Sequence, residues 1–506
     1  MFQSLKRLMR HSAVYGIGHI LTRGVGFLLL PLYTNFLNPD ALGIAAIMFL
    51  YLAISTILYT YGLDSAFLRY FILAEDESEK IRLFSTGFLT VLFTSVLFSV
   101  LGYLFADDLA RVIVLSNVEK FLQNPSSGSP LQHYLNESTI YFQYAATILF
   151  FDALAILPFL VLRAKERSKL FVTLKLLNVI VNLSLNIVFV AKLGYGLRGI
   201  FLANVFSSAF TFLTLLPVIL QHFRPVLLAG ELKKLLVFGL PYLPSTLAVV
   251  LMDLIDRFIL KAIKGYEVLG VYHANYKLAM IMSLFVAAFR FAWHPFFLST
   301  SKQSDAKPIF AKVLTYFMFA CALVYLSISY FMQDIVRIRL GSIHLIGEEY
   351  WGGLTVVPIV MLAYVFYGAY LNFLVGIYLE KKTAYLPFIT GLGLLVNIVG
   401  NFALIPRYGM HGAAWATVFS YVAMAVALYG VSRRLYPVAY EFGRLVRIGA
   451  MMAAYMFILL AWQPGFWWRL ALLLAFPLML LLSGFFEKRE IDTIRSYVMR
   501  LFPGPA

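Results

Sequence analysis

Basic side chains inside long apolar segments are the first feature of this sequence that could do chemistry. Arg23 follows His19 by one helical turn. Arg290 precedes His294 by one turn, and Lys277 lies earlier in the same apolar segment. A guanidinium stays charged and binds oxyanions such as phosphates through paired hydrogen bonds. Because a charge at the centre of a membrane helix costs about 2.5–3.5 kcal/mol, these residues predict a hydrated anion-binding cavity, or else buried ion pairs and side chains that reach the membrane surface.

Acidic residues in the apolar segments are compatible with two roles, ion coupling or charge neutralisation. Asp152 and Asp253 are candidates to bind a coupling cation or a proton, or they neutralise a neighbouring arginine. Asp253 precedes Arg257 by four residues and can pair with it along one helix, so a structural role is favoured there. Two further sets are predicted to act as gates or structural pairs: Asp64 with Arg69, and Asp256 with Arg257.

A stripe of tyrosines follows at Tyr364, Tyr367 and Tyr370. Spacing of three residues places these side chains on one face of a helix. Their rings could stack on sugars or on a prenyl chain. Helix packing or an aromatic belt at the membrane surface is the alternative interpretation.

Motifs for catalysis or cofactor binding do not accompany these residues. The sequence has no G-x-x-x-x-G-K-[ST], no H-E-x-x-H and a single cysteine, Cys321. The longest connection, 106–138, contains a few acidic residues and His133 without catalytic spacing. We therefore expect no enzymatic activity, no metal site and no bound cofactor.

Composition places the chain in a membrane. Hydrophobic residues make up 61% of the 506 positions and charged residues only 13%, whereas soluble proteins have about a quarter charged residues. The formal charge of +16 does not indicate nucleic-acid binding, because the basic residues form short clusters between apolar runs, as membrane loops do.

A membrane span needs about 20 mainly apolar residues, and this rule gives about fourteen spans. The runs lack the alternation of barrel strands, so the predicted fold class is an all-α membrane protein. The expected spans are 13–36, 41–66, 84–105, 139–162, 170–191, 199–220, 237–260, 268–297, 310–332, 351–378, 385–405, 411–431, 445–461 and 467–486.

The two halves of the chain echo each other. Val181-Asn182-Leu183 matches Val396-Asn397-Ile398, and Leu42-Gly43-Ile44 matches Leu269-Gly270-Val271. Matches in the same order, after spans of the same direction, predict two parallel six-helix bundles with a substrate site between them. The expected division is 1–222 for the first bundle, 223–435 for the second, and 436–506 for two additional spans and a tail.

Several motifs together resemble the multidrug/oligosaccharidyl-lipid/polysaccharide exporter superfamily, and within it the polysaccharide-exporting flippases. They are Tyr61-Gly62-Leu63-Asp64-Ser65-Ala66-Phe67-Leu68-Arg69-Tyr70, Leu162-Arg163-Ala164-Lys165-Glu166-Arg167, Asp256-Arg257-Phe258-Ile259-Leu260 and Tyr408-Gly409 with Gly412-Ala413-Ala414. The resemblance covers residues 1–435. It implies two pseudo-symmetric bundles around a cavity that opens alternately to the two sides of the membrane.

The resemblance and the intramembrane cations together favour a flippase for polyprenyl-pyrophosphate-linked oligosaccharide in the bacterial inner membrane. Expected partners are membrane lipid, the lipid-linked glycan, a polysaccharide polymerase and glycosyltransferases, with a proton, sodium or membrane-potential drive. The predicted cavity residues are His19, Arg23, Lys277, Arg290, His294, Tyr364 and Tyr367.

Other functions stay open. The two additional spans occur in superfamily members that move the peptidoglycan precursor, lipid II. An exporter of small cationic drugs is less favoured, because intramembrane arginine and lysine repel a cationic ligand.

The distribution of basic residues predicts the sidedness of the protein. We count 25 Lys and Arg on the side of the N-terminus and 10 on the opposite side, so both termini are expected in the cytoplasm. A reporter fused after Lys120 should therefore be active only as an extracytoplasmic enzyme. Cytoplasmic activity of that fusion would refute the topology.

Overall fold

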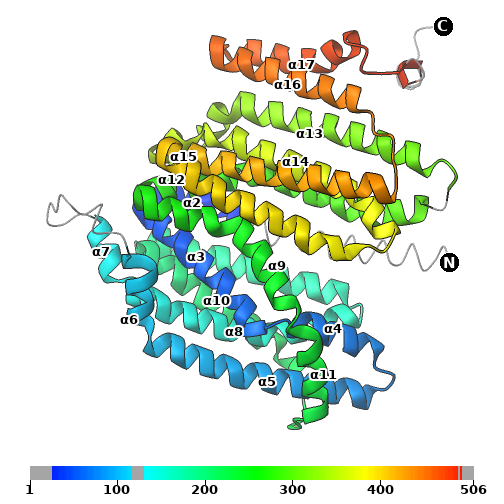
Figure 1. The fold of residues 1–506 in the computed structure, drawn as a ribbon. Helices are drawn as coiled ribbons and strands as arrows, with labels where there is room; N and C mark the ends of the chain where they lie inside the picture. The colour runs from blue at the N-terminus through cyan, green and yellow to red at the C-terminus, as the bar shows by residue number, and fades with distance from the viewer. Residues whose placement is uncertain (1–25, 117–129, 302, 488–489, 493–506) are drawn as a thin grey trace, which may run out of the picture.

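The computed structural model describes residues 26–116, 130–301, 303–487 and 490–492. His19 and Arg23 lie outside the described residues. The architecture is almost entirely helical, as Figure 1 shows, which confirms the predicted all-α class.

The long helices of the first half lie on predicted spans, except that span 41–66 is divided between two helices. Each long helix is a continuous apolar run that satisfies its backbone hydrogen bonds internally, as lipid requires. In chain order they are α2 (Leu30–Phe36), α3 (Pro39–Thr60), α4 (Leu63–Leu73), α5 (Glu77–Leu104), α6 (Ala106–Leu109), η1 (Ala110–Leu115), α7 (Pro130–Asn136), α8 (Ser138–Ala164), α9 (Ser168–Asn186), η3 (Ile187–Lys192) and α10 (Gly196–His222).

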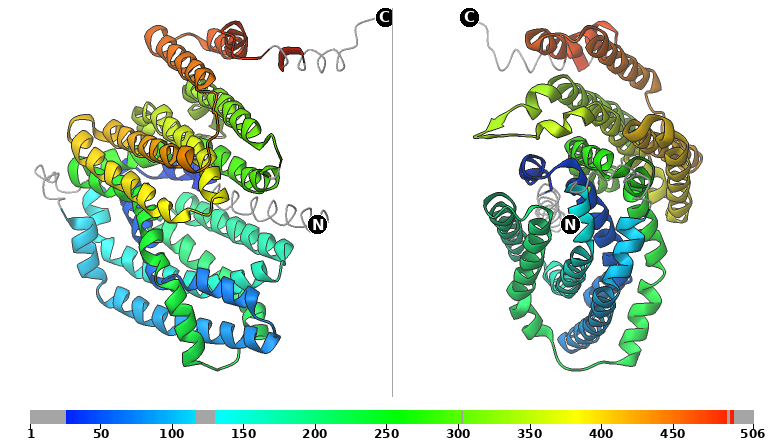
Figure 2. Two further views of the ribbon diagram at one scale, coloured as in Figure 1. Left: turned by 45° about the vertical axis from the view of Figure 1, so that its right-hand side comes forward. Right: turned by 90° about the vertical axis from the view of Figure 1, so that its left-hand side faces the viewer.

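The second half contains two unusually long helices and a two-stranded antiparallel ladder. Its elements are α11 (Ala229–Gly239), α12 (Tyr242–Thr300), α13 (Ala306–Val336), β1 (Arg339–Leu340), β2 (Ile343–His344), η4 (Glu348–Gly353), α14 (Val356–Leu379), η5 (Thr383–Tyr385) and α15 (Leu386–Leu435). The C-terminal pair, α16 (Phe442–Trp462) and α17 (Phe466–Leu482), lies beyond α13 in Figures 1 and 2.

Glycines bend α12 and α15, each of which is long enough to cross a membrane twice. These helices have 59 and 50 residues, whereas one crossing needs about 20. Gly265 (φ 87°) and Gly409 (φ 54°) adopt backbone angles that side chains disfavour, and each divides its helix into two arms. Ten helices in the described part of the chain are long and apolar enough to span a membrane, and these two are among them. The protein is therefore a multi-pass membrane protein, while the total of fourteen spans stays a prediction.

The predicted span 41–66 is wrong as a single helix. Tyr61 (φ 34°) and Gly62 (φ 79°) are both left-handed and separate α3 from α4. A Cβ on Gly62 would overlap the carbonyl oxygen of Gly239, so the backbone of α11 fits against this break. The length of the apolar stretch alone does not reveal such a break, because apolar residues continue on both sides of Tyr61-Gly62.

The matched glycines of the two halves behave alike. Tyr195-Gly196-Leu197-Arg198-Gly199 of the first half aligns with Tyr408-Gly409-Met410-His411-Gly412 of the second, and Gly196 and Gly409 both have φ of 54°. At the next matched pair, a Cβ on Gly199 would press against the backbone of Phe189, and one on Gly412 against that of Leu404. The sequence repeat thus corresponds to a repeat in local backbone geometry.

The two halves meet tightly at one end of the molecule, which we call the closed end. There α3 begins beside the Gly265 bend of α12, and a Cβ on Gly270 would overlap the carbonyl oxygen of Pro39. In the opposite direction, a Cβ on Gly43 would overlap the carbonyl oxygen of Tyr266. Glycine at both positions lets the two backbones touch.

Hydrogen bonds reinforce the closed end. Lys261 Nζ donates to the carbonyl oxygens of Ile113 and Ser116, each at 2.9 Å. Tyr266 donates its hydroxyl to the carbonyl oxygen of Val114 at 2.7 Å. The Lys261 side chain is buried, so its charge depends on these carbonyls in place of water.

Salt bridges attach the C-terminal pair to α13. Arg469 of α17 binds Asp334 at 2.6 Å and also donates to the carbonyl oxygen of Tyr330 at 2.7 Å. Lys312 of α13 binds Glu487, which follows α17, at 3.1 Å, and Arg444 of α16 binds the neighbouring Glu490 at 2.9 Å. Residues near both ends of the pair are therefore held by ionic contacts.

The Gly43–Gly270 contact yields a test of the closed end. A Gly270→Ala variant should push α12 away from α3, because the added methyl group overlaps the Pro39 carbonyl. A cysteine placed at buried Ala46, in a Cys321→Ser background, should then become labelled by a membrane-impermeant maleimide. The control is Gly449→Ala, where a Cβ meets nothing within 4 Å. Equal labelling of the two variants would show that the closed end tolerates the methyl group.

Candidate functional site

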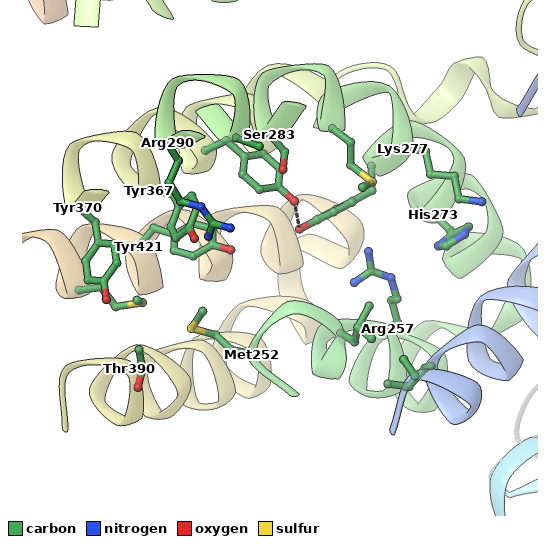
Figure 3. A pocket seen from close by; sticks show the side chains of 18 of the residues that line it. Met252, Arg257, His273, Lys277, Ser283, Arg290, Tyr367, Tyr370, Thr390 and Tyr421 are labelled. Carbon is green, nitrogen blue, oxygen red and sulfur yellow. Dashed lines mark hydrogen bonds between the residues drawn. The ribbon is translucent and has the colours of Figure 1, made fainter. Parts of the chain in front are cut away.

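A cavity of about 640 Å³ lies between α3 of the first half and the helices of the second half. Its wall on the first half is apolar and comes from α3. Its other walls come from both arms of α12, from α14 and from α15, and Figure 3 shows many of these side chains. The lining residues that carry polar or charged groups are Arg257, His273, Tyr276, Lys277, Ser283, Arg290, Tyr364, Tyr367, Tyr370, Thr390 and Tyr421.

The second arm of α12 supplies a cationic stripe. His273 and Lys277 are one turn apart, Ser283 and Arg290 are about two turns apart, and all four side chains line the cavity. His273 is only 6% exposed, whereas Arg290 is exposed. The stripe therefore runs from a buried end near the closed end to an accessible end at Arg290.

Arg257 enters the cavity from the first arm of α12 and is held by its neighbours. Its guanidinium binds Asp256 at 2.8 Å and lies 4.4 Å from the centroid of the Tyr276 ring. The second carboxylate oxygen of Asp256 accepts a 2.6 Å hydrogen bond from Tyr272. A buried charge pair with this many partners is fixed in place. The sequence pairs Asp256 with Arg257 correctly but does not place Arg257 in the cavity wall.

Tyrosines from α12, α14 and α15 line the cavity beside the cationic stripe. The hydroxyl groups of Tyr276 and Tyr364 are 3.1 Å apart. Tyr367 stacks on Tyr370 with ring planes 15° apart, and the centroid of Tyr421 is 5.2 Å from that of Tyr367. The three-residue spacing in the sequence predicts that the tyrosines of α14 share a face. It does not predict that Tyr276 of α12 and Tyr421 of α15 join them, because only the tertiary structure brings these helices together.

Four of the predicted cavity residues line this cavity together: Lys277, Arg290, Tyr364 and Tyr367. Lys277 Nζ lies 5.7 Å from the centroid of Tyr33 and 5.5 Å from that of Phe49. His294 is not among the lining residues, since its ring packs edge-on against Phe297 and Tyr378. One turn of α12 beyond Arg290 is enough to carry it away from the cavity.

Asp152, one of the two predicted ion-coupling residues, is not part of this cavity lining. Asp152 of α8 lies beside Ser208 of α10 and within electrostatic reach of Lys175 of α9, all in the first half. The ammonium group of Lys175 is 4.0 Å from the centroid of the Phe159 ring. The backbone of Asp253 belongs to the first arm of α12, and its side chain lies outside what the structure describes.

The predicted Asp64–Arg69 pair does not form an ion pair in the described structure. Five positions along α4 place the two side chains on different faces of the helix. Arg69 instead lies over the ring of Phe238, 4.5 Å from its centroid. This contact connects α4 to α11. Helix α11 therefore packs on the first half, although the predicted boundary at residue 222 assigns it to the second bundle.

Comparisons with known proteins agree with this architecture. A family model described as "Polysaccharide biosynthesis protein" matches residues 8–301. No curated protein matches the sequence significantly. Among solved structures, the lipid II flippase MurJ in an inward closed conformation has a TM-score of 0.71 at 15% identity, over 93% of this chain and 98% of that one.

Multidrug transporters share the fold as well. An inward-facing MATE family transporter of the MOP superfamily has a TM-score of 0.59 at 17% identity, covering 85% of this chain and 95% of its own. A MATE structure in a straight conformation has a TM-score of 0.54 at 16% identity, covering 88% and 96%. At such low identity these likenesses show a common fold.

The Asp256–Arg257 pair yields a test of the cavity wall. Asp256→Ala should lower the free energy of unfolding by about 3–5 kcal/mol, because it leaves a buried guanidinium uncompensated. Tyr272→Phe removes only one hydrogen bond to Asp256 and should cost about 1 kcal/mol. Equilibrium unfolding in mixed micelles measures both, with exposed Asp305→Ala as the control, expected within about 0.5 kcal/mol of wild type. An Asp256→Ala variant as stable as this control would mean that Arg257 does not depend on the pair.

Proposed function

The chain belongs to the polysaccharide biosynthesis protein family, and from this premise we propose that it is a lipid-linked oligosaccharide flippase. It carries polyprenyl-pyrophosphate-linked oligosaccharide from the cytoplasmic to the outer leaflet for cell-surface polysaccharide assembly. The membrane fold shared with MurJ and MATE transporters supports transport as the activity.

The cavity between the halves is the observation that carries this proposal. It combines a cationic stripe, a set of tyrosines and an apolar wall, which suit a pyrophosphate, sugars and the start of a prenyl chain respectively. Arg290 is the proposed pyrophosphate ligand, because its accessible guanidinium can grip phosphate oxygens with two hydrogen bonds. In a low-dielectric cavity this attraction is stronger and less screened than in water.

Alternating access follows from the way the halves meet. Under the proposed orientation, with both termini in the cytoplasm of a bacterial inner membrane, the closed end faces outward. Transport then requires the Gly43–Gly270 contact to separate after the headgroup has entered. A proton, sodium or the membrane potential supplies the drive, and a polymerase and glycosyltransferases are the proposed partners.

A lipid II flippase is the second candidate. It is favoured by the structural likeness to MurJ over 93% of this chain. Export of a cationic drug is disfavoured by the cationic stripe. Enzymatic conversion of the glycolipid is disfavoured because the family and the structural relatives concern transport and polysaccharide biosynthesis.

Substitutions at Arg290 test the flippase proposal. In proteoliposomes, wild-type protein should relocate a polyprenyl-pyrophosphate-linked oligosaccharide without changing its mass. Arg290→Lys keeps the charge but loses the planar fork, so transport should fall only partly. Arg290→Ala should abolish transport, as should Arg23→Ala if Arg23 also faces the cavity.

The matched control is Arg434→Ala, an exposed arginine outside the cavity, which should transport normally. Protein recovered in the membrane fraction is compared for every variant. Full transport by a stable Arg23→Ala, Arg290→Ala double variant would exclude these arginines as headgroup ligands. A product of altered mass would place the protein among enzymes.

A further inference from the structure

We propose that the closed end of the cavity is a second anion site, distinct from Arg290, which binds a carboxylate on the glycan. The substrate is then an acidic oligosaccharide whose charged sugar is several units from the pyrophosphate. This inference rests on the proposed function and names the class of glycan. The site consists of His273 and Lys277 on the second arm of α12, with Arg257 facing them from the first arm, as Figure 3 shows.

His273 is the observation that points to a ligand. Its side chain lines the cavity, is only 6% exposed, and neither ring nitrogen has a hydrogen-bond partner in the described structure. A buried polar group left without a partner costs about 1–3 kcal/mol, so buried polar groups are nearly always paired. A ligand oxygen in the cavity would accept the hydrogen bond that the imidazole N–H lacks.

The charges around His273 define the ligand as an anion. Among the side chains that the structure describes, the charged groups near His273 are Lys277 and Arg257. Arg257 is compensated by Asp256, but no described carboxylate forms an ion pair with Lys277. Residues 1–25, which precede the part of α2 near Lys277, contain no Asp or Glu. An ammonium beside an imidazole N–H is a suitable donor pair for one carboxylate.

Distance separates this site from Arg290. Lys277 and Arg290 are 13 positions apart on a continuous arm of α12, which corresponds to about 20 Å along the helix. The two phosphates of a pyrophosphate share an oxygen and cannot reach both ends of the stripe. In Figure 3, Arg290 lies beside Tyr367 and Tyr421, while His273 and Lys277 lie at the other end. Met280, Ser283 and Ala287 line the interval of α12 between the two ends, where neutral sugars would lie.

The test compares two probes that differ only at the terminal sugar. One is a polyprenyl-pyrophosphate-linked tetrasaccharide that ends in glucuronic acid, and the other ends in glucose. Purified full-length protein in nanodiscs should bind the acidic probe at least about tenfold more tightly, as one charge-assisted hydrogen bond provides. This comparison needs no substitution, so it does not depend on how a variant folds.

Variants assign the selectivity to the closed end. In both Lys277→Gln and His273→Gln, the tenfold ratio between the two affinities should fall to about one. Arg290→Gln should weaken both probes and keep the ratio. The matched control is Lys264→Gln, a lysine on the same helix outside the cavity lining, which should leave both affinities unchanged.

Three results would overturn the inference in different ways. Equal binding of the two probes by wild-type protein excludes an acidic-sugar site while leaving the flippase proposal intact. Equal weakening of both probes in Lys277→Gln, with the ratio of affinities unchanged, would mean that the pyrophosphate itself occupies the closed end. If wild-type protein binds neither probe, the proposed function fails and the inference fails with it.

Discussion

Hydrocarbon offers no partner for a charge or for a backbone N–H, and this constraint explains where every polar feature of the protein lies. The backbone satisfies itself by forming helices. The charged side chains within the membrane spans must instead find partners inside the protein or water in a cavity. Asp256 and Arg257 pair with each other inside the protein, and the cationic stripe of α12 faces the cavity.

Close backbone contact at glycine is what allows one end of the cavity to close. Gly43 and Gly270 let α3 and α12 approach without side chains between them, and Gly265 turns α12 so that its two arms form two cavity walls. Carbonyl groups of η1 then accept hydrogen bonds from Lys261, so a charged side chain helps to close the gap. Around these contacts the α3 and α12 side chains are apolar and fully buried, among them Leu42 and Leu269, so steric fit, hydrogen bonds and apolar packing together hold this end closed.

The spans and the membrane class follow from the sequence because hydrophobicity is local. A run of about 20 apolar residues needs no tertiary information to be recognised as a helix in lipid. The break at Tyr61-Gly62 is different, because it is stabilised by the backbone of Gly239, which is remote in the chain. The predicted Asp64–Arg69 ion pair is absent from the described structure for a related reason. Both residues lie on α4 but on different faces of the helix, and Arg69 packs on Phe238 of α11, which is remote in the chain.

What the sequence by itself determined is the chemistry available to the cavity: arginine and lysine in the spans, tyrosines at helical spacing, and two halves that repeat. Which of these side chains meet was decided only by the tertiary structure. Lys277, Arg290, Tyr364 and Tyr367 share the cavity with His273, Arg257 and Tyr421, whereas His294 turns toward Phe297 and Tyr378. The bends at Gly265 and Gly409 and the packing of remote helices decide which way the polar face of a helix points. The local periodicity of one segment contains no information about these bends or about this packing.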